Sequence, residues 1–152
     1  MPLLRQPRLV TQLCEAVAEH VKERGGVQIV TALEARGFLF GPQIAAYLNV
    51  PFVPIRKKGK LPGEVVRASY VKEYGEDIVE IQKDALSAGD RVLIVDDLLA
   101  TGGTLAAAVD LITLAGGTVV EVFVIIELAG LKGREKLSKD IHAHALLVYP
   151  DA

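Results

Sequence analysis

The strongest constraint on the fold comes from one segment, VLIVDDLLATGGT, which occupies residues 92–104. Its first four residues are apolar and largely β-branched, which predicts a buried strand. Two adjacent carboxylates, Asp96 and Asp97, end this strand, and a glycine-rich turn leads into a helix that is predicted after Gly103. A strand, a glycine turn and a helix in this order predict an α/β domain with a ligand site beyond the carboxyl end of a strand.

The rest of the chain alternates in the same way between helical segments and apolar strands. This alternation predicts an α/β fold with a mostly parallel central sheet and helices on both faces. Residues 65–74 alternate partly and residues 78–82 alternate cleanly, which predicts a hairpin whose turn lies at residues 75–77. The other predicted helices cover residues 7–24 and 38–48, and the other predicted strands cover residues 27–32, 51–56, 118–126 and 143–149.

Length and composition exclude several classes of protein. The chain has 152 residues without a repeat or a linker, so residues 1–152 are expected to form a single domain. The net charge of −2 gives no bulk attraction for nucleic acid, and no apolar run approaches the roughly 20 residues that span a membrane. The single cysteine, Cys14, rules out a disulfide framework within one chain and is expected to be buried. A cytoplasmic enzyme is the expectation that remains.

Each part of the glycine turn suits a phosphorylated sugar. The amides of Gly102 and Gly103, together with the start of the helix, predict an anion-binding cup, and two threonine hydroxyls stand beside it. The two aspartates can accept hydrogen bonds from the vicinal hydroxyls of a ribose. The alternative is a plain glycine-rich turn with a threonine helix cap and two solvated acids. The residues predicted to hold the ribose and its 5-phosphate are Asp96, Asp97, Ala100, Thr101, Gly102, Gly103 and Thr104.

The same segment resembles the signature with which type I phosphoribosyltransferases bind phosphoribosyl pyrophosphate (PRPP). The resemblance continues through six segments that occur in the order found in the adenine branch of that family, and it covers roughly residues 7–149. It implies the type I fold with a flexible β-hairpin lid, transfer of phosphoribose from PRPP to adenine to give AMP and pyrophosphate, and a homodimer. The segments are RGFLFGP, IRKKGKLPG, ASYVKEYG, EIQKDAL, VDDLLATGGT and LKGREKL.

The resemblance also implies where pyrophosphate binds. Glu34, Ala35 and Arg36 follow the first predicted strand and match the family loop that binds pyrophosphate through backbone amides and an arginine. That loop often has a cis peptide bond, which would join Glu34 to Ala35. Mg²⁺ is implied as a cofactor that PRPP carries, without a direct protein ligand. Arg56, Lys57 and Lys60 are implied to face the pyrophosphate, whereas the alternative for this basic stretch is a solvated loop.

The implied catalytic residues are Glu73, a general base toward the purine, Tyr74, Lys60 and Arg36. Glu73 and Tyr74 belong to a flexible loop, at about residues 57–75, that would close as a lid and exclude water. An exposed hairpin acid is the alternative for Glu73. Leu128 matches a residue that contacts the purine, and ordinary core packing is its alternative. The remaining candidates, His20, His142 and His144, lie outside the family segments and are interpreted as structural or surface residues.

The beginning of the sequence departs from the family pattern. Family members carry a short hood over the purine, with a segment resembling FPxPGxxFRD, before the first helix. This sequence starts MPLLRQPRL and enters its first predicted helix directly, so the hood is expected to be absent. Three interpretations follow: an active enzyme with a rebuilt purine pocket, a regulatory relative that binds PRPP or AMP without catalysis, or a shortened isoform or start-site artefact.

Overall fold

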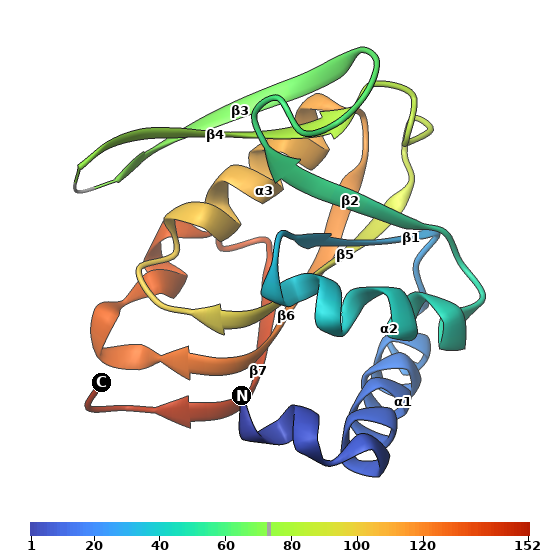
Figure 1. Ribbon diagram of the computed structural model, residues 1–152, viewed down its shortest axis with the longest axis vertical. Helices are drawn as coiled ribbons and strands as arrows, with labels where there is room; N and C mark the ends of the chain where they lie inside the picture. Colours follow the sequence, from blue (N-terminus) through green and yellow to red (C-terminus); the bar gives the residue numbers. More distant parts are fainter. Residues whose placement is uncertain (73) are drawn as a thin grey trace.

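The computed structural model describes residues 1–72 and 74–152, and its centre is a seven-stranded sheet (Figure 1). The strands of this described part are β1 (Ile29–Leu33), β2 (Phe52–Lys57), β3 (Val65–Lys72), β4 (Gly75–Gln82), β5 (Arg91–Leu99), β6 (Thr118–Leu128) and β7 (His142–Tyr149). The helices are α1 (Pro7–Glu23), α2 (Gly41–Leu48) and α3 (Gly103–Leu114), with short 3₁₀ turns η1 (Pro2–Arg5), η2 (Arg36–Leu39), η3 (Ala129–Leu131) and η4 (Gly133–Lys136).

The sheet has a parallel body and an antiparallel hairpin at one edge. Its order is β3-β4-β2-β1-β5-β6-β7; the five strands from β2 to β7 in this order run parallel, whereas β4 is antiparallel to β2 and to β3. Helices α1 and α2 cover one face and α3 covers the other (Figure 1). The predicted α/β class with a mostly parallel sheet is therefore confirmed.

Strand β5 shows why its sequence is continuously apolar. Val92 and Ile94 pack into the core cluster beneath α3, whereas Leu93 and Val95 pack into the cluster beneath α1 and α2. All four side chains are fully buried, because a strand between two helical layers has no solvated face. Cys14 on α1 is buried in the second cluster, as predicted, and burial raises the pKa of its thiol to about 11.

The hairpin is confirmed, but its predicted turn is wrong. Residues 75–77 begin β4, where Gly75 pairs with Lys72 and Asp77 pairs with Tyr70 of β3. The end of the hairpin is solvated on both faces, and Val71 is 82% exposed. Without a buried face, the sequence there has no apolar alternation that could mark the paired positions.

Parallel pairing brings the predicted ligand loops to one edge of the sheet. β1 and β5 are neighbours, with Ala32 opposite Val95, so the loop that follows Leu33 lies beside the loop that follows Leu99. None of the helices in the described part of the chain is long and apolar enough to cross a membrane.

A buried carboxylate anchors the hairpin to the loop after β2. Glu80 of β4 is 1% exposed and lies opposite Arg56 of β2 and Arg67 of β3. It accepts a 2.7 Å hydrogen bond from the amide of Gly59 and a short one from the Arg67 Nε atom. Burial alone would raise the pKa of Glu80, but these hydrogen bonds hold it below its usual value.

Replacing this carboxylate should therefore destabilise the protein. We expect Glu80→Ala to lower the free energy of unfolding by about 1–3 kcal/mol, because the Gly59 amide and the Arg67 guanidinium lose their acceptor. Urea unfolding followed by far-ultraviolet circular dichroism measures this, since the chain has no tryptophan.

The matched control is Glu64→Ala, which removes an exposed ion pair with Lys83 and should cost less than about 0.5 kcal/mol. Equal losses in the two variants would contradict the anchoring role of Glu80.

Candidate functional site

A cavity of about 470 Å³ opens at the carboxyl ends of the parallel strands. Residues from the ends of β1, β2 and β5 form its floor, and Tyr70 and Val79 of the hairpin border it. Most of the predicted ligand residues line this single cavity. The lining comprises Leu33, Glu34, Ala35, Arg36, Ile55, Arg56, Lys57, Tyr70, Val79, Asp96, Asp97, Leu98, Leu99, Ala100, Thr101, Gly102, Thr104 and Leu105.

The glycine turn presents the start of α3 to the cavity. Gly102 precedes α3 with a φ of +86°, a backbone conformation that favours glycine. Its carbonyl oxygen accepts a 2.9 Å hydrogen bond from the backbone amide of Ala106. The first amides of a helix have no partner within the helix, and they carry the positive end of its dipole. The turn therefore offers an anion a set of backbone donors, flanked by the hydroxyls of Thr101 and Thr104.

A second glycine holds this turn in place from behind. A Cβ atom on Gly102 would collide with the carbonyl of Gly133, and one on Gly133 would collide with the carbonyl of Ala100. Two stretches of backbone thus pack directly against each other, and only glycine permits this approach. Gly133 begins η4 within the LKGREKL segment, so that segment supports the glycine turn without lining the cavity.

The two aspartates differ in their surroundings. Asp97 is 8% exposed, and its Oδ2 atom lies 2.7 Å from the Nε atom of Arg36. Asp96 accepts a 2.8 Å hydrogen bond from the backbone amide of Asp97. Burial, assisted by the neighbouring Asp97 carboxylate, raises the pKa of Asp96 to about 7. Near neutral pH, the Asp96 carboxyl can therefore both accept and donate hydrogen bonds.

Both aspartates lie inside β5, although the sequence placed them at its end. The strand continues to Leu99, and its pairing with β6 includes Leu98 opposite Ile126. Backbone pairing with β6 fixes the two aspartates more rigidly than a loop would.

Glu34 gathers the basic residues at the mouth of the cavity. Its Oε1 atom accepts a 2.7 Å hydrogen bond from the amide of Lys57 and lies 3.3 Å from the Arg56 Nε atom. Its Oε2 atom accepts a 2.8 Å hydrogen bond from Lys60 Nζ. Burial would raise the pKa of Glu34, but the hydrogen bonds from Lys60 and Lys57 bring it below its usual value. The peptide bond between Glu34 and Ala35 is cis.

The remaining predicted residues lie at or beyond the rim. Gly103 starts α3 next to the lining residues, and Lys60 reaches the cavity mouth through Glu34. Tyr74 is 93% exposed, and Leu128 is half-buried at the end of β6; neither is among the described lining residues. The prediction for Glu73 lies outside the described residues.

Tyr70 is a cavity residue that the sequence analysis missed. Its hydroxyl donates a 3.1 Å hydrogen bond to Asp77, and burial raises its pKa above the usual value. Alternation along β3 could have found it, because Ala68 and Tyr70 share the face that packs against the core. The lining also includes six larger apolar residues that were missed, because each is typical of an ordinary core position: Leu33, Ile55, Val79, Leu98, Leu99 and Leu105.

Comparison with known proteins shows which family the chain resembles. A family model described as the phosphoribosyl transferase domain matches residues 2–147. An adenine phosphoribosyltransferase of Caenorhabditis elegans is 61% identical over 153 residues, which cover 100% of this chain and 82% of the relative. Adenine phosphoribosyltransferase 1 of Saccharomyces cerevisiae is 46% identical over 144 residues, covering 93% of this chain and 77% of the relative.

Solved structures of such enzymes superpose closely on the chain. The Saccharomyces cerevisiae adenine phosphoribosyltransferase, complexed with an imino-altritol bisphosphate and adenine, gives a TM-score of 0.92 at 46% identity. That alignment covers 96% of this chain and 84% of the other. The Trypanosoma brucei enzyme, in complex with AMP, pyrophosphate and ribose-5-phosphate, gives 0.89 at 31% identity, covering 96% of this chain and 67% of the other.

The raised pKa of Asp96 predicts a pH-dependent stability effect. The carboxyl titrates near 3.8 when unperturbed and at about 7 in the folded protein. Between these values the folded state binds more protons, so the contribution of Asp96 to stability is lost as the pH rises from about 4 to 7. Asp96→Asn keeps an acceptor for the Asp97 amide and does not titrate. Its stability relative to the wild type should therefore rise between pH 5 and pH 8, by on the order of 1–3 kcal/mol.

Urea unfolding at the two pH values measures this difference. Asp110→Asn, which changes an exposed carboxylate on α3, is the control and should show no comparable change. A stability difference for Asp96→Asn that is the same at both pH values would refute the raised pKa.

Proposed function

The chain belongs to the adenine phosphoribosyltransferase family, and we propose that it transfers the 5-phosphoribosyl group of PRPP to adenine, giving AMP and pyrophosphate. The observation that carries this proposal is the single cavity in which a helix N-terminus, an acid pair and a basic cluster converge. A phosphate, a ribose and a pyrophosphate need these three kinds of group in that arrangement. The family resemblance adds the purine.

The glycine turn is proposed to bind the 5-phosphate, and the acid pair the ribose. Backbone amides from Thr101 to Thr104 would donate to the phosphate oxygens. Asp96 and Asp97 would accept hydrogen bonds from the 2′- and 3′-hydroxyls of the ribose. These bonds would fix the sugar relative to the attacking base. The ion pair between Arg36 and Asp97 orients this carboxylate, and it links the ribose end of the cavity to the pyrophosphate end.

The basic residues gathered by Glu34 are proposed to bind the pyrophosphate. Arg56 lines the cavity, and its Nε atom, which lies 3.3 Å from Glu34 Oε1, makes no hydrogen bond among the described residues, so its guanidinium is not fully committed to Glu34. Arg36, Lys57 and Lys60 would add positive charge, and Glu34 and Ala35 would contribute backbone groups. These cations would stabilise the charge that develops on the leaving group.

Mg²⁺ is proposed to enter with PRPP. The carboxylates nearest the pyrophosphate position are already paired, Glu34 with Lys60 and Asp97 with Arg36, which fits an ion held by substrate oxygens and water. When bound, Mg²⁺ supplies neutralising charge on the pyrophosphate. The chain's own residues then orient the reacting atoms around C1′.

The reaction forms one bond and breaks one. The N9 atom of adenine bonds to C1′ of the ribose, while the bond from C1′ to the pyrophosphate oxygen breaks and its electron pair leaves with pyrophosphate. The proton on N9 is proposed to pass to Glu73, with Tyr74 alongside. Residues 57–75 are proposed to act as the flexible lid, and Leu128 to contact the purine.

Three broader properties are proposed with this activity. The chain is proposed to act as a single domain, to form a homodimer and to work in the cytoplasm, as the family resemblance implies. The proposed reaction in the cavity does not depend on any of these three properties.

A product assay tests the proposed function. The protein, incubated with PRPP, Mg²⁺ and one of adenine, hypoxanthine or guanine, should form a nucleotide with adenine alone, measured by chromatography of AMP and by pyrophosphate release. The control reaction omits PRPP. If AMP binds but no pyrophosphate is released with any base, the chain is a nucleotide-binding relative and the proposed activity fails.

A second prediction concerns the proton acceptor. Glu73→Ala should lower kcat by about 100-fold or more, while the dissociation constant for PRPP changes by less than about threefold. The reason is that proton transfer occurs in the transition state, whereas PRPP binding does not use this carboxylate.

Steady-state kinetics and calorimetric PRPP titration separate these two effects. Glu76→Ala, which removes an exposed acid from the same hairpin, is the matched control and should keep near-normal turnover. Near-normal turnover in Glu73→Ala as well would eliminate its role as base while leaving the transferase activity itself intact.

A further inference from the structure

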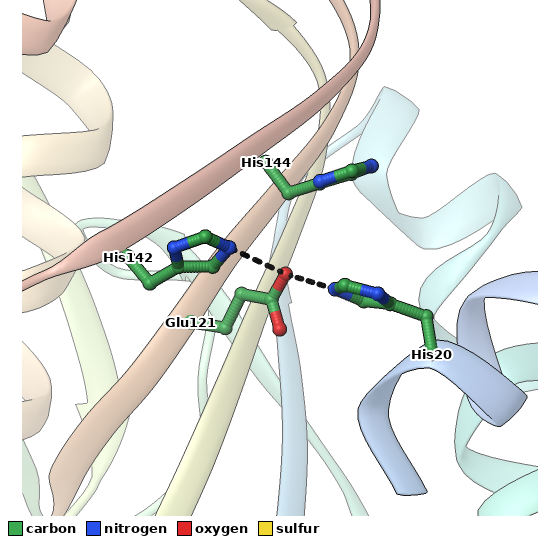
Figure 2. A group of neighbouring side chains, drawn as sticks. All are labelled: His20, Glu121, His142 and His144. Atoms are coloured by element: carbon green, nitrogen blue, oxygen red, sulfur yellow. Dashed lines mark hydrogen bonds and ion pairs between the residues drawn. The ribbon is translucent and has the colours of Figure 1, made fainter. Parts of the chain in front are cut away.

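All three histidines of the chain meet in one cluster. Figure 2 shows His20, His142 and His144 arranged around the carboxylate of Glu121. The sequence separates His20 from Glu121 by 101 residues, and the histidines lie outside the family segments. Each of the four side chains offers one ligand atom, and these atoms all lie within 4.8 Å of one another.

The fold brings these residues together through strand register and one helix end. Glu121 lies opposite His142 in the β6–β7 pair, and Phe123 lies opposite His144. Side chains two positions apart on a strand share a face, so both β7 imidazoles stand on the face that carries Glu121. The last turn of α1 adds His20 from the covering layer. Glu121 pairs with Leu93 near the beginning of β5, so the cluster lies toward the end of the sheet opposite the PRPP cavity.

Two distances in the cluster lie close to the spacing of ligand atoms around a transition metal. Metal–ligand bonds of about 2.0–2.1 Å in a tetrahedron place neighbouring ligand atoms roughly 3.3 Å apart. The Glu121 Oε1 atom lies 2.7 Å from His20 Nε2 and 3.7 Å from His142 Nε2, on either side of that value. The other separations between the candidate ligand atoms stay within 4.8 Å, so all four atoms face one common space.

Burial and neighbouring groups prepare these side chains as ligands. The Glu121 side chain is 3% exposed, whereas His20 and His142 are 31% and 42% exposed, which leaves a path from solvent. The His144 ring stacks on Phe123, with ring centroids 5.8 Å apart, and lies 4.7 Å from the His20 ring.

An ion pair with Arg24 orients the Glu121 carboxylate. Its Oε2 atom lies 3.4 Å from the Nε atom of Arg24, while Oε1 faces the histidines. One oxygen is thus held by the arginine and the other remains directed into the cluster. Carboxylates at metal sites are commonly oriented in this way by an outer hydrogen-bonding group.

We propose that His20, Glu121, His142 and His144 form a metal site, distinct from the transferase cavity, that binds a divalent transition-metal ion of the Zn²⁺ type. Three imidazoles and one carboxylate are a ligand set that Zn²⁺ accepts, whereas Mg²⁺ and Ca²⁺ prefer oxygen ligands alone. The ion would link α1 to β6 and β7, and so stabilise the packing of the first helix on the sheet.

The proposal is tested on the full chain without a histidine tag. Isothermal titration with ZnCl₂ should show one Zn²⁺ bound per chain with a dissociation constant of about 1 µM or tighter, and titration with MgCl₂ should show no binding at this cluster. Saturating Zn²⁺ should raise Tm by about 5 °C, because the ion binds only the folded arrangement.

Variants assign the binding to the cluster. His142→Gln should weaken Zn²⁺ binding at least about tenfold and abolish most of the rise in Tm. His142 is 42% exposed, so its replacement leaves the core intact, and circular dichroism verifies the fold. His144→Gln provides a second, independent ligand removal.

Glu15→Gln, which alters an exposed carboxylate on α1, is the matched control and should bind Zn²⁺ like the wild type. Absence of saturable Zn²⁺ binding, or equally tight binding in the wild type, His142→Gln and His144→Gln, would overturn the proposal.

Discussion

Burial of β5 on both faces fixes the position of the acid pair and the glycine turn in the cavity. Its side chains alternate between the cluster beneath α3 and the cluster beneath α1 and α2, so the strand cannot slide or rotate without exposing one set. Asp96 and Asp97 lie on this immobile strand, and the anion-binding turn follows it directly. The acids and the helix N-terminus therefore have a fixed separation, which a ligand with a phosphate and a ribose requires.

Electrostatic balance within the cavity depends on pairs of opposite charge. Glu34 accepts hydrogen bonds from Lys60 Nζ and the Lys57 amide at the cavity mouth, and Asp97 forms an ion pair with Arg36. Without these carboxylates, several cations around one cavity would repel each other and disperse into solvent. The paired arrangement keeps them close in the absence of an anion, so the proposed binding of pyrophosphate would need less reorganisation.

Much of this architecture could be predicted from the sequence, because local signals mark it. The apolar run of β5, the glycine turn and the apolar face of α1, which buries Cys14, Val17, Ala18 and Val21, each have a period or a composition that few other structures share. The tip of the hairpin could not be placed, since both of its faces are solvated. Alternation along β3 could place Tyr70 on the buried face, but its position at the cavity depends on the approach of β3 to α3, which no local signal marks. The histidine cluster was missed for a related reason: it depends on the register of β6 with β7 and on where α1 ends.

The two ends of the parallel sheet offer opposite charge preferences, and helix polarity explains why. A helix that begins at the carboxyl edge of the sheet, as α3 does, directs its free amides and positive dipole end toward that edge, where anions are favoured. A helix that finishes near the amino edge, as α1 does at Glu23, directs its negative end there. His20 lies in the last turn of α1, so the partial negative charge of that helix end adds to the Glu121 carboxylate. The same alternation of strand and helix that favours a phosphate at one edge thus favours a cation at the other.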